Sequence, residues 1–176
     1  MTTDLVLTLL GPDRPGLVEA VADTIAAHGG NWLESRMAHL AGKFAGILRV
    51  EVPAESTGAL VNALARLEGR GLRIVLEPSA ADSAPLPMQA MELELLGLDR
   101  PGLVREVSRL VAQQGINVEE LETDRSSAPM SAEMMFRARA RLGVPATADL
   151  ATLRKELERL AGDLMVEIHL AEPARR

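Results

Sequence analysis

Short apolar runs and helix-like spacings alternate along the chain in a fixed order. A run such as 5–10, closed by Gly-Pro, is typical of a buried strand, whereas apolar residues three and four positions apart indicate a helix face. In the first half, strands are expected at 5–10, 31–40, 44–52 and 72–76, and helices across 17–25 and 56–67. This β-α-β-β-α-β order predicts an α+β, ferredoxin-like fold, with an antiparallel four-stranded sheet and two helices on one face.

The second half of the chain repeats the pattern. The hexapeptide DRPGLV occurs at 13–18 and again at 99–104, and 14 of 26 paired positions are identical between 9–34 and 95–120. The second set of strands is expected at 91–96, 117–124, 134–140 and 164–170, with helices across 103–111 and 150–160. The chain is therefore predicted to hold two copies of one module.

The boundaries of the two modules follow from the end of the first pattern and the start of the second. A segment at 78–89 is rich in Pro, Ser and Ala and poor in large apolar residues, which is typical of a linker. We predict one domain at 1–77 and a second at 90–172. A connection at 125–131 in the second copy is longer and less turn-like than its counterpart at 41–43.

The repeated hexapeptide falls on the turn from the first strand into the first helix. Asp13 is expected to cap that helix, whose unpaired N–H groups and positive dipole end suit a carboxylate. Gly16 lets a ligand approach the backbone, and Asp13 suits an ammonium group. Asn31, which we place beside this loop, can bond to either charged group. The loop therefore suits the two charged ends of a free amino acid.

A purely structural interpretation of these residues stays open, because caps and glycine turns are common where a strand leads into a helix. Arg14 and Arg100 are expected to point to solvent or to contact an anionic ligand. The candidate ligand-binding residues are Asp13, Arg14, Gly16, Leu17, Val18 and Asn31 in the first copy and Asp99, Arg100, Gly102, Leu103, Val104 and Asn117 in the second.

Composition excludes several classes of function. The net charge is −6, which argues against direct binding of nucleic acid, since that affinity depends on Lys and Arg. The chain has no cysteine, and its three histidines lack metal-ligand spacing. No base–nucleophile pair or phosphate loop is recognisable. We predict a protein that is not an enzyme and has no cofactor or metal. Without a signal peptide or membrane span, it is expected in the cytoplasm.

The motifs resemble the ACT domain, a small amino-acid-sensing module. The resemblance rests on DRPGLV after a short strand, on Gly29-Gly30-Asn31 and Gly115-Ile116-Asn117 after the helix, and on the element order. It implies amino-acid binding at the two loops and homo-oligomers formed through ACT sheets or helices. Two copies with nothing else resemble the tandem ACT repressors of the glycine cleavage system. That resemblance implies a glycine- or serine-like ligand and regulation through a LysR-type transcription activator.

Two other functions are weighed against the sensor. A small ferredoxin-like enzyme, or an ACT regulatory subunit of a metabolic enzyme, is compatible with the same fold. An RNA-binding module needs exposed aromatic residues for base stacking. The chain has no Tyr and two Phe, at 44 and 136, so RNA binding is disfavoured.

Overall fold

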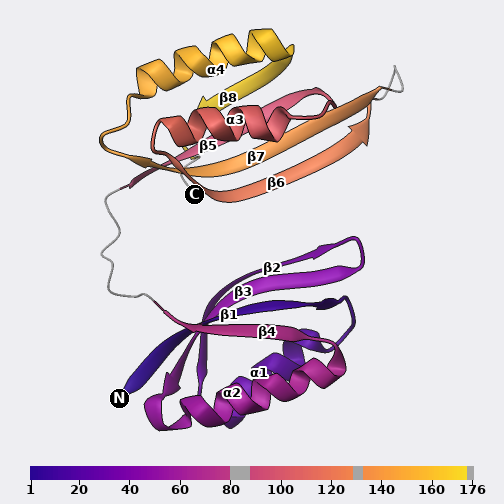
Figure 1. Cartoon of the computed structure of the whole chain (residues 1–176), viewed down its shortest axis with the longest axis vertical. Helices are drawn as coiled ribbons and strands as arrows, with labels where there is room; N and C mark the ends of the chain where they lie inside the picture. The colour runs from indigo at the N-terminus through magenta and orange to yellow at the C-terminus, as the bar shows by residue number, and fades with distance from the viewer. Residues whose placement is uncertain (80–87, 129–132, 174–176) are drawn as a thin grey trace. The chain divides into compact units, whose positions relative to one another are not determined.

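The computed structural model describes residues 1–79, 88–128 and 133–173. Backbone contacts divide the chain into two compact units, Met1–Ala84 and Pro85–Arg176, called unit 1 and unit 2 below. Each unit consists of one four-stranded sheet with two α-helices (Figure 1). The predicted pair of ferredoxin-like α+β modules is therefore confirmed.

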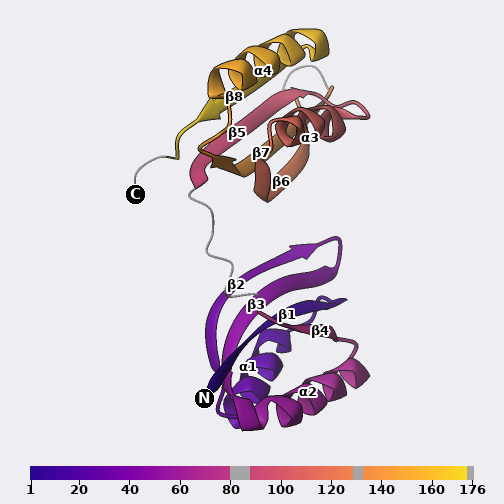
Figure 2. The ribbon, with the colours of Figure 1, turned by 60° about the vertical axis from the view of Figure 1, so that its left-hand side comes forward.

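Unit 1 has the expected element order. Its elements are β1 (Thr2–Pro12), α1 (Leu17–Ala27), β2 (Asn31–Leu40), β3 (Lys43–Pro53), α2 (Thr57–Ala65) and β4 (Arg73–Pro78), with 3-10 turns at Ala54–Ser56 and Arg66–Arg70. The strands are ordered β2-β3-β1-β4, and all three pairings are antiparallel. Both helices lie on the same face of the sheet, which leaves the other face uncovered within this unit (Figures 1 and 2).

Unit 2 repeats this plan with central strands of nearly the same length. Its elements are β5 (Met88–Leu98), α3 (Leu103–Gln113), β6 (Asn117–Ser127), β7 (Met134–Pro145), α4 (Leu150–Leu164) and β8 (Val166–Ala171). The sheet order β6-β7-β5-β8 is the counterpart of unit 1, again with antiparallel pairings throughout.

Each unit has its own aliphatic core between the helices and the sheet. Along β1, Leu5, Leu7 and Leu9 alternate with outward positions and are at most 2% exposed. Val21 and Ile25, one turn apart on α1, close over them. Unit 2 is built in the same way around β5 and α3. The two cores are separate clusters, as expected for two modules of this size.

Some boundaries differ from those expected. β4 continues to Pro78 and β5 begins at Met88, so both ends of the expected linker are strand. β6 continues through Arg125 to Ser127, where a loose connection was expected. Continued pairing with β7 explains this extension, because Arg125 lies opposite Phe136. Residues 129–131 of that connection lie outside the described residues.

The helix α4 shows a cap that the sequence interpretation missed. Asp149 accepts hydrogen bonds of 3.0 Å from the backbone N–H groups of Ala151 and Thr152. The Thr152 hydroxyl donates to the other carboxylate oxygen at 2.7 Å. These hydrogen bonds, led by the one from the Thr152 side chain, lower the pKa of Asp149 below its usual value. The cap therefore fixes the beginning of α4 while Asp149 is ionised.

The equivalent edge strands β2 and β6 contain the same irregularity. The register with the neighbouring strand shifts between Trp32 and Glu34 in β2, and between Val118 and Glu120 in β6. The positions are 86 residues apart, as are the two hexapeptides. A bulge of this kind interrupts strict alternation, so Trp32 and Ser35 are both partly buried. The duplicated units thus share even this local feature.

Candidate functional site

The loop from β1 to α1 turns on a glycine in the left-handed region. Gly16 has φ +85° and Gly102, its equivalent before α3, has φ +97°. Helix α1 therefore begins at Leu17, and its first intrahelical hydrogen bond runs from the Ala20 N–H to the Gly16 carbonyl at 3.0 Å. No side chain caps either helix. The prediction that Asp13 is the helix cap is therefore wrong, because Asp13 lies three residues before the cap position.

Asp13 is held at the tip of the loop by its backbone and leaves its carboxylate accessible. Its N–H donates to the Gly42 carbonyl at 3.0 Å, which ties the loop to the β2–β3 turn. Its carboxylate Oδ2 lies 3.6 Å from Nε2 of His39. The side chains are 44% and 60% exposed, and the imidazole is charged only when protonated. The carboxylate thus has no permanent cation against it among the described residues.

Asp99 occupies the equivalent place in unit 2 but has a strong partner. Its N–H donates to the Met134 carbonyl at 2.8 Å. Its carboxylate Oδ2 lies 2.7 Å from Nη2 of Arg125, and only 23% of the Asp99 side chain is exposed. Arg125 stands where His39 stands in unit 1, 86 residues earlier. The permanently charged guanidinium of Arg125 therefore forms an ion pair with the carboxylate of Asp99 in the second loop.

The expectation that Asn31 lies beside the loop is wrong. Asn31 pairs with Glu51, and Glu51 pairs with Asp4 at the beginning of β1. The loop follows Pro12 at the other end, opposite Lys43. Eight residues of extended chain separate the two levels, which corresponds to about 26 Å. The crossover through α1 returns the chain to the starting end of the sheet, so β2 begins far from the loop and ends beside it.

Unit 2 shows the same separation. Asn117 pairs with Gly143, and Gly143 pairs with Ala90 near the beginning of β5. Asp99 follows the other end of β5. The two asparagines are exposed, and neither shares a site with its loop. The residues that do lie beside the loops are His39 and Arg125. Because β1 and β2 run parallel, the end of β2 and not its beginning lies at the loop, and this topology could have located both residues.

The two loop arginines do different things. The Arg14 guanidinium donates to the Arg70 carbonyl, and a Cβ built on Gly71 would lie 2.9 Å from its Nη2. Arg14 thus fastens the loop to the segment before β4 rather than pointing only to solvent. In Arg100 the Nη2 atom is buried and has no hydrogen-bond partner among the residues that the structure describes.

The remaining candidates are apolar residues of the first helical turn. Leu17 is partly buried against the unit 1 core, and Leu103 is 3% exposed. Val18 and Val104 are 44% and 39% exposed. Their backbone N–H groups belong to the first turn of a helix, where intrahelical acceptors are missing. These residues therefore offer backbone donors to a ligand, while their side chains belong mainly to the core and its margin.

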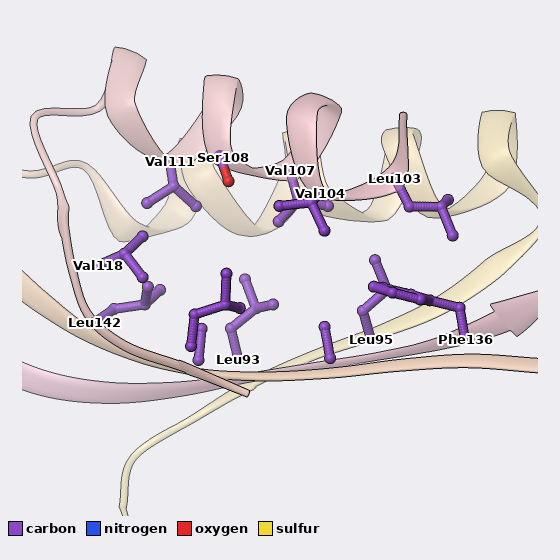
Figure 3. Close-up of a pocket in the computed structure, with 13 residues that line it drawn as sticks. Leu93, Leu95, Leu103, Val104, Val107, Ser108, Val111, Val118, Phe136 and Leu142 are labelled. Atoms are coloured by element: carbon purple, nitrogen blue, oxygen red, sulfur yellow. The ribbon is translucent and has the colours of Figure 1, made fainter. Parts of the chain in front are cut away.

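An apolar pocket lies below α3 in unit 2. Helix residues Val104, Val107 and Val111 point down toward Leu93 and Leu95 of β5, and Val118 of β6 closes one end (Figure 3).

In unit 1 the position of Val118 is taken by Trp32, whose ring packs on the core and whose Nε1 donates to the Ser35 hydroxyl at 3.3 Å. The pocket of unit 2 thus lies where Val118 fills less space than Trp32 fills at the equivalent position of unit 1.

Other kinds of site are not found in the described ranges. No group of three or more metal-ligating side chains is present there. No helix in the described ranges is long and apolar enough to cross a membrane. Arg49, on the outer face of the unit 1 sheet, has its pKa raised by the hydrogen bond and charge of Asp4, with a smaller effect of Glu34. That cluster is an ion-pair network rather than a pocket.

Comparison with known families assigns both units. Residues 3–74 and residues 88–167 each match a family model described as ACT domain. The glycine cleavage system transcriptional repressor of Escherichia coli is 25% identical over 162 residues, which cover 91% of this chain and 85% of the repressor.

A crystal structure of a protein of unknown function from Galdieria sulphuraria is 29% identical. It has a TM-score of 0.84 and covers 99% of this chain and 100% of its own. The phosphoserine phosphatase SerB2 of Mycobacterium tuberculosis is 28% identical over 121 residues, which are 65% of this chain but only 29% of the phosphatase.

Proposed function

Because this chain belongs to the ACT domain family, we propose that it is a regulatory sensor of a small free amino acid, glycine or serine in kind. The family match covers both units, and the similarity to the glycine cleavage system transcriptional repressor extends over most of both chains. The regulated process is transcription in glycine cleavage or amino-acid metabolism. The single observation that carries the proposal is the accessible Asp13 carboxylate in the loop that leads into α1.

The loop of unit 1 offers complementary groups to both ends of an amino acid. The free N–H groups of the first turn of α1, with the positive end of the helix dipole, receive the carboxylate. The Asp13 carboxylate receives the ammonium. Hydrogen bonds to charged groups contribute about 1.5–3 kcal/mol each, so two or three of them reach the roughly −4 kcal/mol of a millimolar sensor.

The loop of unit 2 is assigned a structural role. An ammonium ion would have to displace Arg125, whose guanidinium lies 2.7 Å from Asp99. The carboxylate is also less exposed than that of Asp13. We therefore assign amino-acid binding to the first loop alone, with Arg125 serving as the internal cation of the second.

The sensor acts through a protein partner. The net charge of −6 disfavours direct DNA binding, so a LysR-type transcription activator is the partner that the resemblance suggests. Copies of the chain associate through their ACT sheets or helices. The match to part of a phosphatase favours one alternative, an ACT regulatory subunit of a metabolic enzyme. Binding to the enzyme rather than to the activator would distinguish it.

Thermal unfolding with added amino acids tests the sensor. Glycine or serine at millimolar concentration should raise the melting temperature, because a ligand that binds the native state stabilises it by mass action. Asp13→Asn should abolish the rise and leave the melting temperature without ligand nearly unchanged, since the side chain is exposed.

The matched control is Asp99→Asn, which should keep the full rise. An unchanged rise in Asp13→Asn would remove the loop from the mechanism. No rise with any of the common amino acids would contradict the sensor itself.

A further inference from the structure

One face of the unit 1 sheet points away from the helices and carries an apolar patch. We call it the outer face; its apolar residues are Val6, Thr8 and Leu10 of β1, Ala38 and Leu40 of β2, Ala45 and Ile47 of β3, and Val75 of β4. Thr8 is included for its methyl group. Leu10, Ile47 and Val75 are 45%, 52% and 49% exposed, and Leu40 is 78% exposed. Thr8 lies opposite both Ile47 and Val75, so these side chains form one continuous patch across three strands.

The corresponding face of unit 2 is charged. Glu94 stands where Thr8 stands in unit 1, and its register partner Arg139 stands where Ile47 stands. The Arg139 Nε lies 2.9 Å from the Glu94 carboxylate.

The neighbouring position adds to this charge lattice. Arg141 is ion-paired at 3.0 Å with Glu119 and at 2.9 Å with Glu120. The same fold therefore accepts a fully solvated outer face, and the apolar face of unit 1 is not a requirement of the architecture.

An antiparallel sheet with one solvated face normally alternates apolar and polar residues along each strand. The middle of each central strand of unit 1 instead carries apolar side chains on both faces, from Val6 to Leu10 in β1 and at Ala45 and Ile47 in β3. A contiguous apolar patch with a charged rim is the usual mark of a protein interface. The outer face of unit 1 thus has the character of a protein–protein interface.

The charged rim identifies what covers it. At the end where β1 begins lie Asp4, Glu34 and Glu77, against a single Arg49. At the other end lie the basic residues Lys43 and Arg73, level with Pro12 and Leu10. The face is therefore acidic at one end and basic at the other. The apolar patch lies between them, and Arg36 of β2 lies beside the patch, opposite Ile47. Such a surface is complementary to itself when a second copy is turned end for end.

We propose that two copies of this chain associate through this outer face, sheet on sheet, about a two-fold axis that runs across the strands. This axis places the acidic end of each copy on the basic end of its partner and patch on patch. An axis along the strands would place like charges together. The proposal rests on the association suggested above and specifies its surface.

The contact is expected to be reversible. Three strands with about nine residues each in the contact, and β4 with six, lie about 4.8 Å apart. They present roughly 500 Å² per copy, or roughly 1,000 Å² in total. That area lies at the small end of specific interfaces, where association is weak or transient. The dimer should therefore form and dissociate over the micromolar range.

Sedimentation equilibrium of the full chain tests the proposal. The wild type should pass from monomer to dimer as its concentration rises through the micromolar range. Leu10→Glu places a charge within the patch and should weaken the dimer at least tenfold. Leu96→Glu, at the equivalent position of unit 2 opposite Arg137, should leave it unchanged.

A second variant guards against a folding defect. Thr8→Glu combined with Ile47→Arg installs the ion pair that unit 2 already carries, so the sheet should fold with an unchanged circular dichroism spectrum. It should nevertheless be monomeric. A wild type that stays monomeric would overturn the proposal. A dimer that both variants leave intact would also overturn it, and would show that copies associate elsewhere while leaving the sensor test with glycine and serine unaffected.

Discussion

The two hexapeptide loops are identical in sequence yet differ in what faces them. In unit 1 the Asp13 carboxylate has an exposed histidine 3.6 Å away; in unit 2 the Asp99 carboxylate is bound to Arg125 at 2.7 Å. The outer faces differ in the same sense, being apolar in unit 1 and charged in unit 2. One backbone plan thus supports two chemical surfaces. We therefore propose both ligand binding and self-association for unit 1, although the two units share one fold.

The strongest disruption is expected where unit 1 fills space that unit 2 leaves open. Trp32→Val gives unit 1 the residue that unit 2 has at 118, and removes a large ring packed against the core. The free energy of unfolding of unit 1 should fall by about 2–3 kcal/mol, because a cavity is created. Chemical denaturation followed by NMR signals of each unit measures the loss.

The reverse substitution is its control. Val118→Trp inserts an indole beside the apolar pocket of unit 2, where it should destabilise far less or even stabilise. Equal and large losses in both units would show that the pocket is packed as tightly as unit 1.

A smaller loss of stability is expected at the loop glycines. Gly16 and Gly102 both have φ near +90°, which a β-branched residue adopts only with strain. Gly16→Val and Gly102→Val should each destabilise their own unit by about 1–3 kcal/mol. Differential scanning calorimetry measures both variants.

Ligand binding sharpens this comparison, since only Gly16→Val should also reduce the response to amino acids. A loss of the response through Gly102→Val would contradict the division between the loops.

Much of the fold was predictable from the sequence, and for a physical reason. The core positions of β1 and α1 follow the two-residue and 3.6-residue periods that burial imposes. These periods identify the buried residues Leu5, Leu7, Leu9, Val21 and Ile25 from the sequence. The repeat supports the assignment because the same pattern occurs in both halves of the chain. Strand ends were less predictable, because pairing with a neighbour extends β6 beyond the apolar pattern.

The local structure of the candidate site was predicted only in part. The hexapeptide lies on the turn from strand to helix as predicted, but Asp13 does not cap the helix, because Gly16 in the left-handed region precedes its first residue. Asn31 was placed at the wrong end of the sheet, since adjacency in the motif is not adjacency across a crossover. His39 and Arg125, which contact the two loop carboxylates, lie near the ends of the edge strands β2 and β6. No local sequence pattern indicates that they lie beside the loops.

The central claim is that each chain binds one amino acid, in unit 1, because Arg125 occupies the second loop. Isothermal titration of the folded protein with the amino acid that raises its melting temperature measures this most directly. The wild type should bind one equivalent, Asp13→Asn none, and Arg125→Leu two, because the Asp99 carboxylate is then released. Two equivalents in the wild type, or one equivalent that Asp99→Asn removes, would contradict the account.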